Sequence, residues 1–426
     1  MILSVSKSLR RLMQSQLRAF GRDAGLIMFS RLLQNANGFL LSIAIIRKFG
    51  LAAAGSLTIS TIGTVVLATF LTFGLPYVFA RREASIGVRN AIGLVAALAA
   101  LVASIPVCLA LGLCFGKSSE EILAITLLSF GGAFFAQTLV ANALLVLQDR
   151  AADIIFSPLG NLLGLAAGYF LTHDFATFAA IVAGCRFLGV FMIFARLPLC
   201  NVPFAELKTH FRQGLQFLTA DTVGLIADQA AVMIASALMT RADLGIFGLC
   251  RQMLTVSDTP LWSRLTAWYP RVVADQVGAT TQLRREMLKM GVLCGLGLAA
   301  LAMPLGLWIY HLPAFLLAAP LMVACVPFRY VVATCEMSLR AFGSIGLVNK
   351  VTLLRCLLVV LLPGGIYLSG LYGAIAASLV QVVILAWVTG RLVSAHLSRR
   401  KAAMGAEDDR GTRVDDDTRL GFQVTS

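Results

Sequence analysis

Apolar stretches of about twenty residues recur along the whole chain and constrain its fold more than any other feature. A helix of that length crosses about 30 Å of hydrocarbon, because it rises about 1.5 Å per residue. Apolar residues make up 58% of the chain and charged residues only 13%, which does not suit a soluble surface. The sequence therefore predicts an all-α integral membrane protein of about twelve transmembrane helices. The candidate spans are residues 24–46, 52–80, 91–115, 122–147, 154–171, 175–197, 215–239, 244–269, 288–310, 312–333, 347–368 and 371–393.

Lys and Arg gather in the connections between the spans and form no stripe on a polar face. The net charge of +14 therefore indicates membrane topology, and no nucleic-acid partner is expected. Alternate connections and the two ends carry roughly 22 Lys and Arg. The opposite side carries only Arg47, Lys48, Lys117 and Arg241. Because cytoplasmic loops carry such an excess, both termini are predicted to lie in the cytoplasm.

The two halves of the chain share a pattern in which basic and small residues open the second span and a proline ends it. Six spans per half is an even number, so both halves begin on the same side, which predicts two parallel six-helix lobes. The pattern comprises Arg47, Lys48, Gly50, Ala54, Gly55 and Pro76 in the first half, and Arg241, Leu244, Gly245 and Pro270 in the second. The predicted divisions are a cytoplasmic basic segment at 1–22, an N-lobe at 23–199, a linker at 200–212, a C-lobe at 213–395 and a disordered cytoplasmic tail at 396–426. The first of these is either an amphipathic helix on the membrane surface or a solvated tail.

Polar side chains inside the spans are the best guide to function. A charge at the centre of a transmembrane helix costs at least ~2.5 kcal/mol, so it persists only when it is paired, hydrated or used. The first span carries Arg31, Gln34, Asn35, Gly38 and Ser42 on one face. This stripe fits either a cavity wall or a hydrogen-bonded helix interface.

Aspartates stand at a spacing of seven residues in the second half, as Asp221 and Asp228 in the seventh span and as Asp258 with Arg251 in the eighth. That spacing places Asp221 and Asp228 on one face, about 10 Å apart. The three aspartates are candidates for coupling or gating, with a proton or sodium ion as the coupling ion. Pairing with a nearby arginine is the alternative.

Arginines at membrane depth indicate an anion-binding interior. Arg186 lies near the middle of the sixth span, and with Arg31 and Arg251 it is hard to explain by proximity to a helix end. Guanidinium groups stay charged and grip a pyrophosphate or carboxylate through two parallel hydrogen bonds. Glu336 and Arg340, four residues apart, are expected to form an ordinary ion pair.

Residue types that carry enzyme chemistry are scattered. The nine cysteines include no CxxC pair and have no suitably spaced histidine, so neither a metal site nor a cofactor is expected. His173, His210, His311 and His396 stand in connections and helix ends, without a nucleophile and base at a workable spacing. The sequence does not predict an enzyme.

This arrangement resembles the multidrug/oligosaccharidyl-lipid/polysaccharide exporter (MOP) superfamily, which includes MATE-type exporters, and within it the O-antigen (Wzx-type) and polysaccharide flippases. The segments that carry the resemblance are GLIMFSRLLQNANGFLLSIAIIRKFG, LAAAGSLTI and RADLGIFGLCRQMLT, and it extends over residues from about 22 to 395. It implies two helical lobes around a central cavity in a bacterial inner membrane. Such a protein takes an undecaprenyl-diphosphate-linked oligosaccharide from the cytoplasmic leaflet and releases it outward by alternating access.

The resemblance also implies that Arg31 and Arg251 are cavity arginines, and Gln34, Asn35 and Arg186 complete the expected substrate-binding set. Expected partners are the lipid-linked oligosaccharide, membrane lipids, and polysaccharide polymerase and chain-length proteins.

The main alternative is a cation-coupled drug or small-molecule exporter of the same superfamily. Such exporters usually carry an acidic residue in the first lobe, and the first span here has none. A major-facilitator transporter ranks lower, because the 81–89 connection lacks that family's acidic, glycine-centred pattern. A membrane scaffold without transport has no need of interior arginines.

Overall fold

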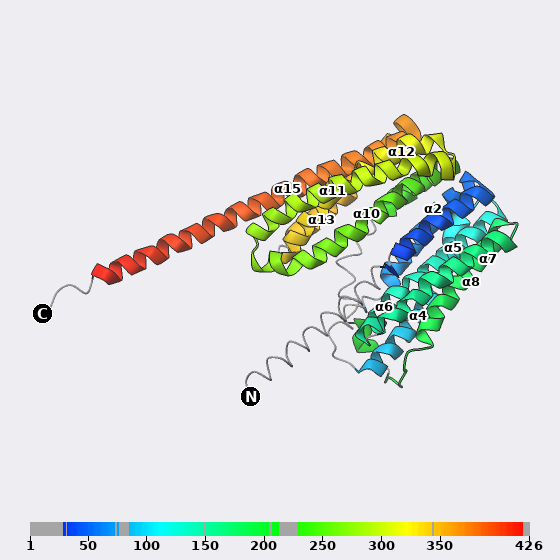
Figure 1. Cartoon of the computed structure of the whole chain (residues 1–426), viewed down its shortest axis with the longest axis horizontal. Helices are drawn as coiled ribbons and strands as arrows, with labels where there is room; N and C mark the ends of the chain where they lie inside the picture. The colour runs from blue at the N-terminus through cyan, green and yellow to red at the C-terminus, as the bar shows by residue number, and fades with distance from the viewer. Residues whose placement is uncertain are drawn as a thin grey trace. The chain divides into compact units, whose positions relative to one another are not determined.

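The computed structural model describes residues 29–30, 32–72, 75, 85–148, 150–203, 207–212, 229–342 and 345–420, and this part is helical with no strand (Figure 1). The predicted all-α membrane fold of about twelve helices is confirmed. Six helices in the described part are each long and apolar enough to cross a membrane. The predicted segment at 1–22 lies outside the described residues.

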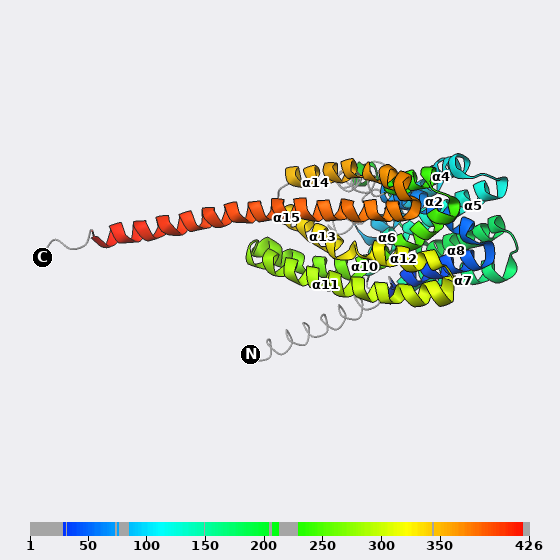
Figure 2. The same cartoon turned by 90° about the horizontal axis from the view of Figure 1, so that it is seen from above.

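Helices of the first half follow the predicted spans closely (Figure 2). The first span is helical over 32–49, and Gly50 then takes a φ of +86°, which turns the chain into α2 without the steric cost that a Cβ would bring. The fourth predicted span is interrupted at Gln137 and forms two helices. The elements are α2 (Leu51–Leu71), α4 (Ile86–Phe115), α5 (Ser119–Ala136), α6 (Thr138–Leu147), η1 (Ala151–Ile155), α7 (Phe156–Leu171) and α8 (Phe175–Phe194).

Packing in the first half centres on α5, which contacts α2, α4 and α8, while α7 packs along α8. Small residues let α7 and α8 approach closely: a Cβ added to Gly164 would come within 2.6 Å of the Cβ of Cys185. Asp174 begins α8 by accepting a hydrogen bond from the N–H of Thr177 at 2.7 Å. These contacts fix the positions of polar side chains on the same helices.

Helices of the second half include a π-helical segment and a break in helical geometry. Residues 229–238 are helical, and α11 changes to a π-helix, η2, at its end. Ser369 and Gly370 break the helical geometry, with Gly370 at a φ of +55°, so residues 361–368 belong to the eleventh span and the twelfth begins at Leu371, as predicted. The elements are α10 (Arg241–Ala274), α11 (Gly278–Pro304), η2 (Leu305–Tyr310), α12 (Pro313–Val323), α13 (Val326–Ala341), α14 (Ile345–Leu358) and α15 (Leu361–Leu420).

The chain divides into two compact units. The first comprises Met1–Gln252, Met303–Ala318 and Leu362–Ile375, and the second comprises Met253–Ala302, Ala319–Leu361 and Ala376–Ser426. These units do not coincide with the predicted lobes, because the first unit also contains the ends of second-half helices that flank the connections at 239–240, 311–312 and 369–370. The lobe boundaries at 199 and 213 therefore remain a prediction.

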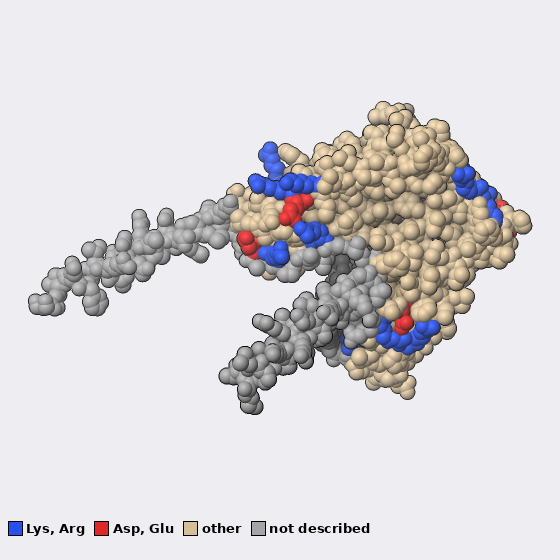
Figure 3. Space-filling view, in the orientation of Figure 1, with Lys and Arg blue, Asp and Glu red and all other residues tan. Residues whose placement is uncertain are grey.

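Large apolar side chains cover much of the surface. Phe170, Trp308 and Leu368 are each more than 70% exposed, and Lys and Arg gather in separate groups with broad uncharged areas between them (Figure 3). Exposed apolar surface on this scale needs an apolar surround. The chain is a multi-pass membrane protein.

In the tail, α15 continues as a helix to Leu420, and the disorder expected for residues 396–426 stays a prediction. Residues 397–406 are rich in Ala, Arg and Lys, which favour helix.

Candidate functional site

Three of the eight predicted site residues, Arg31, Asp221 and Asp228, lie outside the described residues. The other five lie in helices. Four of them share the first compact unit and one lies in the second. The five are Gln34, Asn35, Arg186, Arg251 and Asp258.

Part of the polar stripe on the first span is a helix interface. The hydroxyl of Ser42 lies 2.9 Å from Oε1 of Gln252 on α10. A Cβ added to Gly38 would lie 2.7 Å from Nε2 of the same glutamine, so this face meets α10 closely. Gln34 and Asn35, one to two turns earlier, are only partly buried. Of the two interpretations of the stripe, the interface applies to Gly38 and Ser42.

Arg186 is held by α7. Its Nε donates a hydrogen bond to Oδ1 of Asn161 at 2.7 Å, and its Cδ lies 3.6 Å from where a Cβ would stand on Gly131. One turn earlier on α7, the carbonyl of Pro158 accepts a hydrogen bond from Nδ2 of the buried Asn37 at 2.9 Å. The first span, α7 and α8 are thus linked by polar contacts that also orient the guanidinium group of Arg186.

Sequence reasoning missed Asn37 and Asn161, although an available signal pointed to them. A primary amide in an apolar span must find hydrogen-bond partners, because none is offered by lipid. Nδ2 of Asn37 meets it at the carbonyl of Pro158 on another helix, and Oδ1 of Asn161 meets it at Arg186. Both residues belong to the neighbourhood of the candidate site.

Arg251 lies on α10 directly before Gln252 and is partly buried. It shares the first compact unit with Gln34, Asn35 and Arg186. Two guanidinium groups, on α8 and α10, therefore lie in helices of one unit. Such groups can hold a phosphate or carboxylate.

Asp258 lies in the second unit and has a strong cationic partner. Nη2 of Arg329 on α13 lies 2.9 Å from both of its carboxylate oxygens. Beside this pair, the hydroxyl of Tyr330 donates to the carbonyl of Ser257 at 2.7 Å. The role of Asp258 in coupling remains a prediction, and the structure adds the arginine that any such role must involve.

Glu336 has an interhelical partner that the sequence did not reveal. It forms an ion pair with Arg355 on α14 at 2.5 Å, beyond the expected pairing with Arg340 on its own helix. Arg329 and Glu336 stand seven residues apart on α13, so one face of α13 bonds to both α10 and α14. Spacing along one helix cannot predict partners that lie on others.

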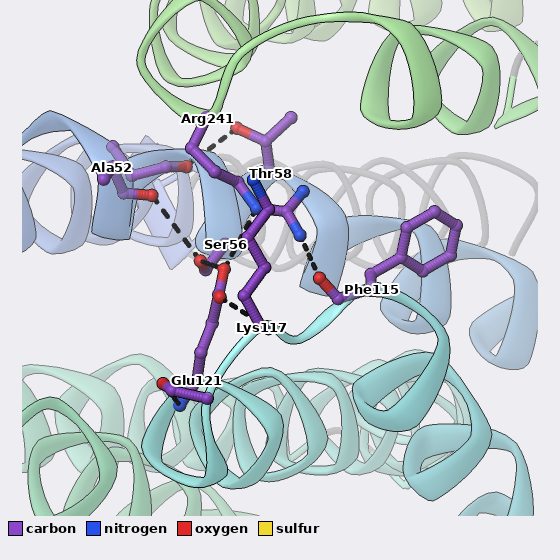
Figure 4. A network of polar contacts seen from close by, with 9 residues as sticks. Ala52, Ser56, Thr58, Phe115, Lys117, Glu121 and Arg241 are labelled. Carbon is purple, nitrogen blue, oxygen red and sulfur yellow. Dashed lines mark hydrogen bonds and ion pairs between the residues drawn. The ribbon is translucent and has the colours of Figure 1, made fainter.

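A second polar network joins α2, α5 and α10 (Figure 4). Nε of Arg241 lies 3.0 Å from Oε1 of Glu121, and Nη2 of the same arginine bonds to the carbonyl of Phe115. Ser56 donates to Oε1 of Glu121 at 2.7 Å, and the N–H of Lys117 donates to Oε2 at 2.9 Å. Burial acts to raise the pKa of Glu121, but these hydrogen bonds and the charge of Arg241 outweigh it, and the pKa lies below its ordinary value.

Metal ligands do not cluster in the described part of the chain, where no three His, Cys, Asp or Glu side chains come together. The polar sites there consist of arginines, carboxylates, amides and hydroxyls. Their chemistry is binding by charge and hydrogen bonds.

Comparison with known proteins places the fold. No family model and no curated protein sequence matches the chain. A solved multidrug-resistance MATE-family transporter of the MOP superfamily, in an inward-facing conformation, superposes with a TM-score of 0.63 at 18% identity, over 86% of this chain and 96% of that one. The chain has the fold of MOP-superfamily transporters.

Two further structures with the MOP fold are similar to this chain. The lipid II flippase MurJ, in an inward closed conformation, gives a TM-score of 0.61 at 13% identity, over 88% of this chain and 87% of that one. A MOP-superfamily transporter from Pyrococcus furiosus gives 0.61 at 15% identity, over 90% of this chain and 96% of that one. The structural similarity shows the MOP fold, and sequence identities this low leave the substrate open.

Proposed function

We propose that this protein is a flippase that moves an undecaprenyl-diphosphate-linked oligosaccharide, an O-antigen or exopolysaccharide repeat unit, from the cytoplasmic to the periplasmic leaflet by alternating access. The observation that carries the proposal is the sign of the charge inside the helices. Arg186 lies in α8, which is long and apolar enough to cross a membrane, Arg251 lies in α10 within the eighth predicted span, and Arg31 stands in the first predicted span. All seven carboxylates of residues 1–199 fall in or next to connections: Asp23, Glu83, Glu120, Glu121, Asp149, Asp153 and Asp174.

Interior arginines suit a lipid diphosphate. Attraction between opposite charges is much stronger in a low-dielectric surround than in water. A guanidinium group holds a phosphate through two parallel hydrogen bonds, and hydrogen bonds to charged groups contribute about 1.5–3 kcal/mol each. A cationic drug would meet repulsion from the same groups.

Known proteins of this fold include both kinds of transporter. MurJ is a lipid II flippase, which supports a lipid-linked substrate, whereas other neighbours are multidrug transporters. The Pyrococcus furiosus transporter has a binding pocket of reverse polarity that suggests a different function, so pocket charge varies on this fold. We assign the protein to the bacterial inner membrane with both termini in the cytoplasm, alongside polysaccharide polymerase and chain-length proteins.

Complementation tests the proposal. The gene is expressed in strains that lack their own O-antigen or exopolysaccharide flippase, and surface polymer is measured per amount of membrane-inserted protein. We expect polymer from the intact chain and a strong loss in Arg31→Ala and Arg251→Ala. Lys at either position should restore polymer in part, because it keeps the charge but cannot form two parallel hydrogen bonds. Arg285→Ala, which removes an exposed arginine, serves as the matched control.

A cation-coupled drug exporter gives the opposite result. Expression would raise resistance to cationic drugs, polymer would not be restored, and the interior arginines would be dispensable. Normal polymer from both Ala variants would contradict the anion-binding mechanism.

A further inference from the structure

The four basic residues on the sparsely charged side of the protein are all in the described part, and three of them bind the carbonyl ends of helices. Lys48 donates to the carbonyls of Gly168 and Tyr169 and lies 3.5 Å from Oγ1 of Thr172, at the end of α7. The last carbonyls of a helix lack partners within it and carry partial negative charge. Helix ends therefore explain why cations stand on this side at all.

Arg47 binds a helix end of the second half of the chain. Its Nε donates to the carbonyl of Ile309 at 2.8 Å, and its Nη2 donates to the carbonyl of Trp308 at 3.1 Å. Trp308 and Ile309 belong to η2, which ends the third span of the second half. Arg47 itself ends the first span of the first half. All three residues belong to the first compact unit.

Arg241, from the second half of the chain, makes the corresponding contact with a helix end of the first half. It follows the first span of the second half, and its Nη2 donates to the carbonyl of Phe115, the last residue of α4. Helix α4 is the third span of the first half. Each half thus extends an arginine from its first connection to the carbonyl end of the other half's third span. Glu121 and Ser56 extend the second of these contacts through the network in Figure 4.

Helices α2 and α10, the second spans of the two halves, meet between these contacts. A Cβ added to Gly245 would lie 2.7 Å from the carbonyl oxygen of Leu51 and 3.2 Å from the N of Gly55. A Cβ on Gly55 would in turn clash with the carbonyl oxygen of Arg241. Gly55 and Gly245 are the corresponding small residues of the repeated pattern. The two backbones therefore touch, and no substrate can pass between them here.

We propose that Arg47 and Arg241 form a pair of reciprocal latches that hold the two halves together at this end of the protein, and that both must release for this end to open. The inference rests on the proposed function only in calling this end the outer gate of a transport cycle. The contacts themselves are present in the structure without any substrate.

An arginine that only caps a helix end should affect that end alone, whereas a latch should affect the contact between the two halves. Loss of either arginine should loosen the whole α2–α10 contact, because the two contacts flank it. Loss of Lys48, the immediate neighbour of Arg47, should not, since its hydrogen-bond partners Gly168, Tyr169 and Thr172 all belong to the first half.

Hydrogen–deuterium exchange of the intact purified protein, measured by mass spectrometry without substrate, tests this. We expect Arg47→Gln and Arg241→Gln each to raise exchange about tenfold or more in peptides covering both 51–60 and 241–250, a factor that corresponds to about 1.4 kcal/mol. Lys48→Gln should change exchange only around 168–172. Gln keeps a hydrogen-bonding side chain, and Arg47→Lys and Arg241→Lys, with intermediate effects expected, serve if a Gln variant does not fold.

Exchange confined to the residues next to each substitution, with 51–60 and 241–250 as protected as in the unaltered protein, would overturn the latch. Because no substrate is present, this result stands whether or not the protein restores polymer in the complementation assay. A protein with intact latches and no polymer would contradict the proposed substrate alone.

Discussion

A single nitrogen of Arg329 on α13 lies 2.9 Å from each carboxylate oxygen of Asp258 on α10. The two side chains are 35% and 25% exposed, so the pair is neither on the open surface nor fully buried. It ties α10 to α13 within the second unit. Removing one partner removes this interhelical ion pair.

This pair predicts a coupled loss of stability. We expect Asp258→Asn and Arg329→Gln each to lower the free energy of unfolding by about 1–3 kcal/mol, between the values for exposed and buried pairs. The double variant should lose less than the sum, because each single change already removes the interaction between the two side chains. Thermal unfolding in detergent measures this, with Arg285→Gln as the exposed control. Additive losses would mean that the two charges do not interact.

Glycine contacts predict a difference between two otherwise similar substitutions. Gly245→Ala adds a methyl group 2.7 Å from the carbonyl of Leu51, whereas Gly184→Ala on α8 meets no atom within 4 Å. Both gain helix propensity, so the difference isolates the α2–α10 contact. We expect Gly245→Ala to cost about 1–3 kcal/mol and Gly184→Ala to be neutral or stabilising. Equal unfolding temperatures for the two variants would argue against close packing of α2 on α10.

Glu121 predicts a pH dependence. Its pKa in the folded protein lies below the ordinary value of 4.5, so its contribution to stability is complete above that pH and is lost as pH falls through the lowered pKa. Its charged partner is Arg241, its neighbour Glu120 is engaged with the N–H of Phe175, and Asp243 bonds to Thr240. We therefore assign the effect to the hydrogen bonds from Ser56 and Lys117 together with the ion pair with Arg241.

The measurement compares the unfolding temperature of Glu121→Gln with that of the unaltered protein across pH. The unaltered protein should be the more stable at pH 7, and the difference should shrink once pH falls below 4.5. A difference that stays constant over this range would contradict the assignment.

Sequence alone predicted the membrane fold and most span boundaries, because length and apolar content decide whether a helix can cross a bilayer. The boundary between the last two spans, at Leu368 and Leu371, coincides with the observed break at Ser369 and Gly370. The break of the fourth span at Gln137 was not predicted, since the apolar pattern continues through it.

Interhelical partners escaped prediction for a different reason. A helical period shows which residues share a face, but the facing helix depends on the tertiary packing. Arg241 and Glu121 are 120 residues apart, and the sequence around each residue does not indicate that they interact. The repeat of basic and small residues at 47–55 and 241–245 did mark the right positions, although only the structure shows that their partners are helix ends.

Arg186 and Asn161 give the sharpest test of whether an interior arginine serves the substrate. The hydrogen bond from Nε of Arg186 to Oδ1 of Asn161 fixes the guanidinium group on α8. Asn161→Asp keeps an acceptor of the same shape but neutralises the arginine, whereas Asn161→Ala removes the acceptor and keeps the charge. If Arg186 attracts a diphosphate, surface polymer should fall about tenfold or more in Asn161→Asp and in Arg186→Ala, and less in Asn161→Ala, since one charge-assisted hydrogen bond contributes about 1.5–3 kcal/mol. If Arg186 only braces α7 against α8, the order reverses: Asn161→Asp strengthens the contact and transports normally, while Asn161→Ala is the damaging change. Surface polymer per amount of inserted protein decides between the two roles of Arg186. Asn161→Asp is the more damaging change if Arg186 binds substrate, and Asn161→Ala is the more damaging change if Arg186 only joins the helices.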